Sequence, residues 1–334
     1  MAALCCWLHG AGRTTALAYQ CDAHHHGVVV KIFVAVTDKD WFNRLSAEQP
    51  DEVNFWAPSG RNSFRAVQPG ELFLFKLHAP DNFIVGGGVF SHASNLPLSL
   101  AWDAFGTKNG VPSLPEMRRR ITHYRKDAGP ELARSDPVIG CRILTTPFFW
   151  PRDRWLPIPE SWSRNIVVGR GYDTSDVEGL ALWNAVMERT NATNLTAASS
   201  PNRYGNPTLV RPRLGQGAFR VLVTDAYERR CAVSGERTLP ILDAAHIRSY
   251  ADGGSHDGDN GLLLRTDIHK LFDLGYVTVD EASRFVVSGR LKADFDNGKH
   301  YYDLHGRPIR QPRLVAAAPS VDALRWHREQ RFLG

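Results

Sequence analysis

The stretch from Leu239 to Asp273 constrains the fold more than any other part of this 334-residue chain. Residues 240–247 are mostly apolar and few enough for a strand, residues 252–260 are rich in turn-forming residues, and residues 262–264 are leucines. Two apolar runs on either side of a turn-rich loop predict a pair of strands. Asp267 can cap a helix that follows them. The sequence therefore predicts the order strand, loop, strand, helix.

Three polar residues mark this segment. His246 ends the first expected strand, Asn260 ends the loop, and His269 lies on the expected helix. An imidazole can act as a base near neutral pH or as a ligand for a divalent metal ion. Hydrolysis of a phosphodiester needs both roles, because a cation neutralises the phosphate while a base deprotonates the attacking water. The pattern indicates a site for cutting phosphodiesters.

These residues resemble the HNH nuclease family, and the likeness extends over residues 215–310. The resemblance implies a ββα-metal domain that binds one divalent ion. It makes His246 the general base and His269 a metal ligand. Asn260 would hold the loop and help to orient the base. The ion would be Mg²⁺, Mn²⁺ or Ni²⁺, among which a mixed nitrogen and oxygen site does not choose.

The chain departs from the commonest HNH pattern at the position before the base, where a metal-binding Asp or His often stands and this chain has Ala245. Asp243 is the nearest carboxylate, and we expect it to be the second metal ligand. In a regular strand its side chain would face away from His246, although a bulge would re-aim it. No structural zinc is expected, because the five cysteines form no CxxC pair.

The first half of the chain is predicted to be rich in β-strands. Strands are expected at residues 28–36, 70–77, 83–90 and 139–149, and helices at residues 41–45 and 115–125. This order fits a curved sheet or open barrel with flanking helices. Together with the C-terminal ββα unit it gives the whole chain the α+β class.

Residues 54–90 combine an aromatic loop, a Gly-Arg-Asn stretch, a Pro-Gly-Glu turn into a Phe-rich strand, and an Ile-Val-Gly-Gly-Gly strand. This series resembles the EVE branch of the PUA-like superfamily, over residues 28–173. The resemblance implies a reader of nucleic acid that takes a modified base out of the helix. A reader joined to an HNH domain resembles a modification-dependent restriction endonuclease. Its expected partner is double-stranded DNA carrying 5-methyl- or 5-hydroxymethylcytosine.

A base pocket needs an aromatic ring for stacking and a few polar groups. The stacking candidates are Trp56, Phe55 and Trp41, and the polar candidates are Asn54 and Ser59. Trp56 is favoured because it precedes an Ala-Pro-Ser-Gly loop, and loops on rigid scaffolds carry binding groups. The alternative is that these aromatic residues fill the core, as most do in β-rich domains.

The net charge of +5 has the sign expected of a nucleic-acid binder. Candidate DNA contacts are Arg61, Asn62, Arg118, Arg119, Arg120, Arg125, Arg211 and Arg213. Such side chains would bind phosphates, which supply affinity without sequence information, although runs of charge are also common on solvated faces. One ββα unit should cut one strand, so double-strand cleavage implies a homodimer or two successive nicks.

The expected division of the chain is a poorly ordered extension at 1–27, a reader at 28–173, a helix and mobile linker at 174–214, the nuclease at 215–310, and a tail with a short helix at 311–334. A mobile linker would allow a loosely defined cut position. We expect a cytoplasmic protein, since no apolar run is long enough for a membrane helix and the start lacks a signal peptide. Two alternatives stay open: a nuclease indifferent to modification, and an inactive DNA-binding module.

Overall fold

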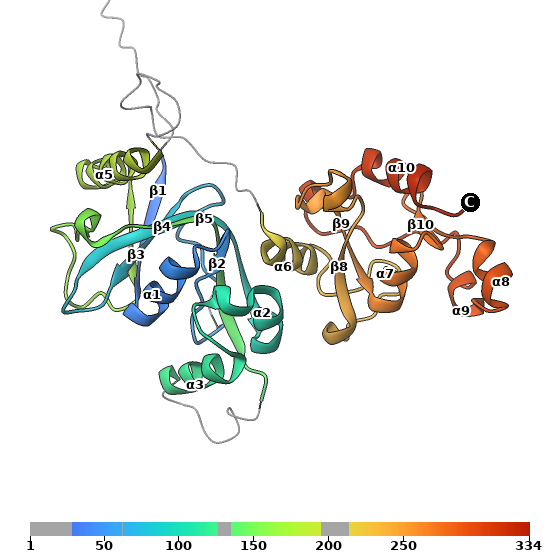
Figure 1. The fold of residues 1–334 in the computed structure, drawn as a ribbon, viewed down its shortest axis with the longest axis horizontal. Coiled ribbons are helices and arrows are strands. Elements are labelled where there is room, and N and C mark those ends of the chain that lie inside the picture. Colours follow the sequence, from blue (N-terminus) through green and yellow to red (C-terminus); the bar gives the residue numbers. More distant parts are fainter. Residues whose placement is uncertain (1–28, 62, 126–134, 195–213) are drawn as a thin grey trace, which may run out of the picture.

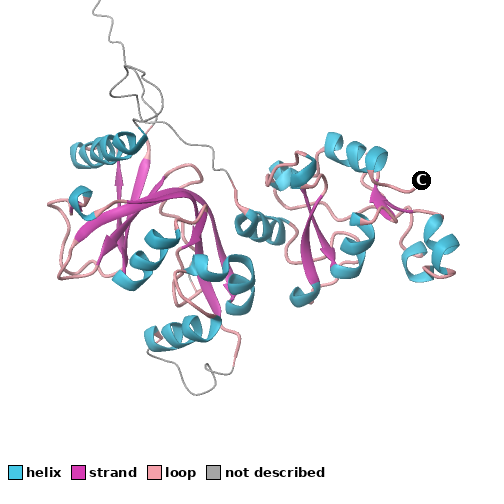
Figure 2. Cartoon of the chain, in the orientation of Figure 1, coloured by secondary structure: helices cyan, strands magenta, loops and turns pink. Residues whose placement is uncertain are grey.

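The structure is a computed structural model that describes residues 29–61, 63–125, 135–194 and 214–334. It has an N-terminal half built on one large sheet and a C-terminal half built on two short strand pairs, with helix α6 between the halves (Figure 1). Helices lie around the strands in both halves (Figure 2). The α+β class predicted from the sequence is confirmed. Each helix among the described residues is too short or too polar to span a bilayer.

The N-terminal half contains a seven-stranded mixed sheet with the order β2-β5-β4-β3-β1-β7, in which β6 pairs with β4. Its strands are β1 (Lys31–Thr37), β2 (Glu52–Asn54), β3 (Leu72–Leu77), β4 (Phe83–Pro97), β5 (Val138–Phe149), β6 (Leu156–Pro157) and β7 (Gly169–Asp173). Strands β1 and β3 run parallel, whereas the other pairs are antiparallel. The order ends on β2 and β7, so within the described residues the sheet does not close. A PUA-like barrel is not confirmed.

Aromatic residues fill the interior of this half. Every residue of β3 is buried, so the strand contributes side chains to both faces of the sheet. The ring of Phe75 lies 4.9 Å from that of Trp41, and the ring of Phe73 lies 5.0 Å from that of Phe55. The helices of this half are α1 (Lys39–Glu48), α2 (Leu98–Phe105), α3 (Leu114–Tyr124) and α5 (Val177–Asn194). Asp38 caps α1 by accepting from the backbone N–H of Trp41, which fixes that residue against the sheet.

The C-terminal half begins with the predicted order of elements. The strands β8 (Leu242–His246) and β9 (Gly261–Arg265) pair antiparallel, and α7 (Thr266–Asp273) follows directly. The chain continues through β10 (Val277–Val279), β11 (Phe285–Val287), α8 (Arg290–Phe295), α9 (Lys299–Tyr302) and α10 (Val321–Gln330). One hydrophobic cluster includes residues from Phe219 to Leu324. The core of this half therefore extends past residue 310 into the segment expected to be a tail.

Helix α10 is fixed to the core of the C-terminal half by His327, which is 2% exposed. Its Nε2 lies 3.0 Å from the carbonyl oxygen of Phe272 and donates to it, since a carbonyl only accepts. Its Nδ1 then accepts from the hydroxyl of Thr278 at 2.9 Å. The imidazole also stacks on the ring of Phe272, with centroids 3.7 Å apart. Burial lowers the pKa of His327 to about 4, so the ring is neutral at pH 7.

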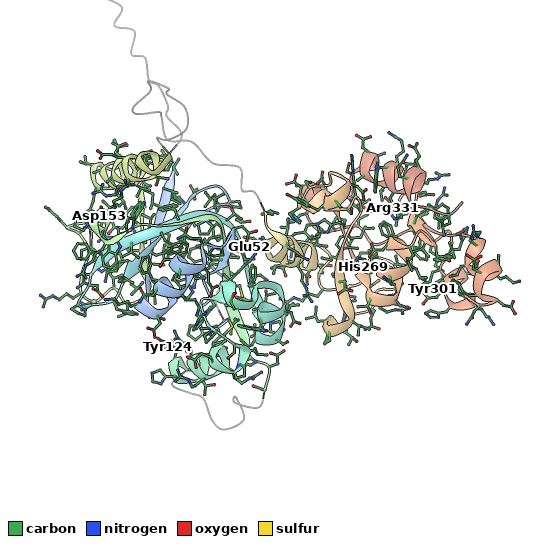
Figure 3. The ribbon with its side chains drawn as sticks, viewed as in Figure 1. Glu52, Tyr124, Asp153, His269, Tyr301 and Arg331 are labelled. Carbon is green, nitrogen blue, oxygen red and sulfur yellow. The ribbon has the colours of Figure 1, made fainter. Side chains whose placement is uncertain are left out.

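Helix α6 (Gln216–Ala226) packs into both halves. Its Ala218 and Val221 belong to the core cluster of the N-terminal half, and its Phe219 and Val223 belong to that of the C-terminal half. The helix start is held by Glu52 of β2, whose fully buried carboxylate accepts from the backbone N–H groups of residues 217 and 218 at 2.8 and 2.9 Å. Figure 3 labels Glu52 on the side of the N-terminal half that faces the C-terminal half.

A second contact supports the same joint. Near the other end of α6, the carboxylate of Asp225 lies 3.0 Å from Nε2 of His92 in β4. Helix α6 follows the segment expected to be a mobile linker, and it is packed against the sheet of the N-terminal half. The expected extension at 1–27 and most of the expected linker lie outside the described residues.

Candidate active site

Three of the residues that the sequence singled out, Asp243, His246 and His269, line one pocket at the junction of β8, α7 and α6. The pocket is lined by Gln216, Phe219, Arg220, Asp243, Ala244, His246, Ser249, Tyr250, His269 and Asp273. It therefore contains the expected base, His246, and both expected metal ligands, Asp243 and His269. Asn260 is buried outside this lining. Figure 3 shows His269 in the interior of the C-terminal half, on the side toward α6.

The strand geometry explains how Asp243 reaches the pocket. The buried positions of β8 are Leu242 and Ala245, three residues apart, whereas a flat strand would alternate every second residue. Asp243 and His246, also three apart, consequently both line the pocket. Ala245, which stands where many HNH domains have a metal ligand, is fully buried in the core. Asp243 therefore does not face away from His246, because the side chains of β8 do not alternate between the two faces of the strand in the simple way.

His246 is held on two sides. Its ring stacks on that of Phe219 from α6, with centroids 3.9 Å apart and planes 11° apart. Its Nε2 lies 2.9 Å from Nδ1 of His256, whose ring in turn stacks on Tyr250. Burial, followed by the charges of His256 and His269, lowers the pKa of His246 to about 4. The imidazole is therefore unprotonated at neutral pH and able to accept a proton.

Sequence reasoning missed two of these neighbours. His256 lies in the turn-rich loop, which folds back and brings its ring into hydrogen-bonding distance of His246. Phe219 was not singled out, because it lies on a helix that precedes the motif. Gly261 lies opposite His246 in the strand pair and leaves room for the ring of Phe219. A Cβ atom at residue 261 would lie 3.0 Å from two carbon atoms of that ring.

Asn260 secures the loop that carries His256. Its side-chain oxygen accepts from the backbone N–H of Arg248 at 2.9 Å, and its amide nitrogen donates to the carbonyl oxygens of Arg248 and Ser255 at 2.9 and 2.7 Å. These bonds hold the two ends of the loop together, as expected. Its amide acts on the base only through the loop backbone, because its hydrogen bonds go to Arg248 and Ser255 and not to the ring of His246.

Asp243 and His269 fit a divalent ion. The carboxylate oxygen of Asp243 lies 3.4 Å from Nδ1 of His269, and that of Asp273 lies 3.5 Å from Nε2 of the same ring. Two ligand atoms that bind a small divalent ion at right angles lie roughly 3 Å from each other, close to the separation of the Asp243 oxygen and the His269 nitrogen. The described residues include no group of three or more His, Cys, Asp or Glu side chains arranged to hold a metal. Water and a substrate phosphate would complete the coordination.

Most of the residues predicted to line an aromatic base pocket are buried in the core and cannot contact a base. Trp41, Phe55 and Asn54 are buried in the core of the sheet, where they pack against other side chains. Trp56 is half-buried, and its Nε1 donates to the carbonyl oxygen of Asn109 at 2.9 Å. Ser59 accepts from the backbone N–H of residue 61. The alternative that the aromatic residues form the core is therefore correct for Trp41 and Phe55, because a two-sided sheet needs large side chains to fill it.

The predicted DNA-binding arginines of α3 have partners within the chain. Arg119 and Arg120 pair with Glu116 at 2.7 and 2.8 Å, and these contacts lower the pKa of Glu116 to about 2. Arg118 donates to the carbonyl of residue 135, and Arg125 donates to that of residue 58. Arg61 is exposed. Asn62, Arg211 and Arg213 lie outside the described residues. These arginines therefore have partners within the chain, and their role in binding DNA stays a prediction.

A comparison with protein families identifies the segment that contains most of the pocket residues. Residues 231–280 match a family model described as HNH endonuclease. This segment is an HNH endonuclease domain. It spans β8, the loop, β9 and α7, and so contains every residue that the sequence assigned to catalysis.

A comparison with curated proteins gave no match. Among solved structures, the chain is similar to one titled "Modification dependent TagI restriction endonuclease", with 13% sequence identity and a TM-score of 0.28. The match covers 85% of this chain and 76% of that chain. At this TM-score no shared fold is established.

Proposed function

We propose that the protein is a divalent-metal-dependent DNA endonuclease that acts in the cytoplasm on DNA carrying 5-methyl- or 5-hydroxymethylcytosine. The nuclease activity is carried by one observation: Asp243, His246 and His269 line one pocket of an HNH endonuclease domain. The N-terminal half would be the reader of the modified base. Its resemblance to PUA-like readers and its contact with the nuclease through α6 support this assignment.

In this proposal His246 accepts the proton of the attacking water, which its lowered pKa keeps it free to do at neutral pH. Phe219 and His256 hold the imidazole in place from two directions. Asp243 and His269 would hold Mg²⁺, Mn²⁺ or Ni²⁺. When bound, the ion neutralises the phosphate and stabilises the leaving 3′ oxygen. One such site cuts one strand, so a double-strand break would need a homodimer or two successive nicks.

The test is cleavage of two plasmids of identical sequence, one carrying modified cytosine, in the presence of Mg²⁺ or Mn²⁺. We expect the modified plasmid to be cut faster. Equal rates on the two plasmids would refute dependence on modification and leave an ordinary nuclease. The variant His246→Ala should lose cleavage and keep DNA binding.

A second candidate function is a DNA-binding module with an inactive nuclease centre. It is favoured by Ala245, which occupies the place of a frequent metal ligand, and by the small number of metal ligands that the described residues bring together. If the wild-type protein binds DNA and cuts nothing with any of the three metals, this second function is the correct one.

A further inference from the structure

The active-site pocket has one wall that comes from outside the HNH segment. This wall is helix α6, which contributes Gln216, Phe219 and Arg220 to the lining. These positions are three and four residues apart, so they lie on one face of the helix. The HNH match begins only at residue 231, so the side chains of α6 are not part of it. The pocket has a volume of about 460 Å³, which is large enough to hold a phosphodiester.

The charges in this pocket are unevenly shared between its walls. Among the described residues, Arg220 is the only lining residue with a permanent positive charge. The two acidic lining residues, Asp243 and Asp273, lie beside the ring of His269, where a metal ion would bind. A phosphodiester is anionic, and an arginine matches the geometry of phosphate oxygens. Arg220 therefore supplies from α6 the charge that a substrate phosphate needs.

The N-terminal half fixes the place of this arginine. Nη1 of Arg220 donates to the carbonyl oxygen of Asp103 at 3.4 Å, in the last turn of α2. Carbonyl groups in the last turn of a helix carry partial negative charge and attract a cation. The two helices approach closely at residue 217, where a Cβ atom would lie 2.5 Å from the carbonyl oxygen of Ala104. Gly217 thus allows α2 and α6 to pack so that Arg220 enters the pocket.

The alternative is that Arg220 only connects α6 to α2. The bond to Asp103 is long for an N–H···O bond, whose usual length is about 2.9 to 3.0 Å. Among the described residues, no carboxylate forms an ion pair with the guanidinium. A guanidinium has five N–H donors, so one weak bond leaves most of them to water or a ligand. This arrangement suits a group that waits for an anion better than one that holds two helices together.

We propose that Arg220 is a further catalytic residue, whose guanidinium donates to a non-bridging oxygen of the phosphate being cut. The water oxygen bonds to phosphorus and its proton goes to His246, while the bond from phosphorus to the 3′ oxygen breaks and that oxygen takes a proton from solvent. A cation held in place beforehand stabilises the negative charge of the transition state. The inference rests on the proposed function, because it adds a residue to that same nuclease site. It also makes the N-terminal half part of the cutting site.

The experiment uses the full-length protein with Mg²⁺ or Mn²⁺ and two kinds of substrate. Bis(p-nitrophenyl) phosphate is a small anionic phosphodiester without a base, so its hydrolysis depends on the pocket alone. The second substrate is the pair of plasmids with and without modified cytosine. The test variants are Arg220→Met, which removes the charge, and Arg220→Lys, which keeps the charge and loses the planar fork. The matched control is Arg237→Met, an exposed arginine of the C-terminal half that does not line the pocket.

We expect Arg220→Met to lower kcat about 100-fold on the small diester and on the modified plasmid, because it removes a contact that is strongest in the transition state. KM should change by less than about threefold. Arg220→Lys should recover roughly a tenth of the wild-type kcat, and Arg237→Met should match the wild type. The midpoint of thermal unfolding should stay the same in Arg220→Met, because only one long hydrogen bond is lost. If kcat falls only together with this midpoint, Arg220 is structural and the inference is wrong.

The outcomes separate this inference from the proposed function. If the wild-type protein cuts the modified plasmid faster and Arg220→Met keeps the wild-type kcat, the inference is wrong and the proposed function stands. If the wild-type protein cuts both plasmids at equal rates and Arg220→Met loses kcat as expected, dependence on modification is wrong and the inference stands. If the wild-type protein hydrolyses neither the plasmids nor the small diester, both are refuted.

Discussion

Replacing Glu52 by alanine should separate the two halves of the protein. The buried carboxylate accepts from two backbone N–H groups at the start of α6 and lies 3.2 Å from Nζ of Lys108. Each hydrogen bond to a charged group contributes about 1.5 to 3 kcal/mol, and Glu52→Ala leaves both N–H groups and the lysine without this acceptor. We expect the free energy of unfolding to fall by about 3 to 5 kcal/mol.

The assay is urea unfolding followed by tryptophan fluorescence, together with hydrogen exchange at the amides of Gly217 and Ala218, which should speed up. Asp51→Ala is the matched control. Asp51 pairs with the same lysine at 2.6 Å, but its side chain is 67% exposed, so its loss should cost less than about 1 kcal/mol. If Glu52→Ala is no less stable than Asp51→Ala, the buried carboxylate does not hold α6, and the reasoning fails.

Three further predictions concern the aromatic and histidine neighbours of the site. Phe219→Leu removes the ring that stacks on His246 and should lower kcat about two- to tenfold with little change in KM. If KM rises two- to tenfold instead and kcat does not change, Phe219 does not position the base. His256→Phe keeps the stack on Tyr250 and removes the hydrogen bond to His246, so kcat for cleavage should fall by about tenfold, whereas wild-type rates would show that the bond is dispensable. The pKa of His327 is lowered from 6.5 to about 4, so between these values the unfolded chain binds more protons at this residue. The contribution of His327 to stability should be full above pH 6.5 and fall by roughly 3 kcal/mol as the pH falls toward 4, in addition to the similar contribution of His246. Urea unfolding at pH 7 and pH 4.5 measures this decline, and His327→Asn should reduce it; an identical decline in both proteins would exclude His327 as the cause.

The nuclease motif was predictable because its information is local. Apolar runs and turn formers over 35 residues determine β8, the loop, β9 and α7, and the order of these elements brings His246 and His269 to one pocket. What escaped prediction depends on tertiary contacts. Phe219 reaches His246 from a helix that precedes the motif, and His256 reaches it through a loop whose path is set by the hydrogen bonds of Asn260.

The N-terminal half was harder to predict, because its side-chain packing depends on the order of its strands. Its main strands were placed from their apolar runs, although β4 continues well past residue 90. The sequence did not show which aromatic side chains face the interior, because Trp41, Phe55 and Phe64 look alike until the strand order is known. Arg142 lies within a strand, where an arginine at an alternating position usually reaches solvent, and only the fold shows its guanidinium above the ring of Phe64.

Helix α6 connects the two halves of the protein through contacts on both of its sides. Phe219 stacks on His246 in the C-terminal half, while Arg229, just beyond the helix, donates to the carbonyl of Asn95 in β4. In the proposed function, this connection places a fixed length of folded protein between the half that would read the DNA and the half that would cut it. Acting as proposed, the enzyme would leave ends at a constant number of base pairs from the mark.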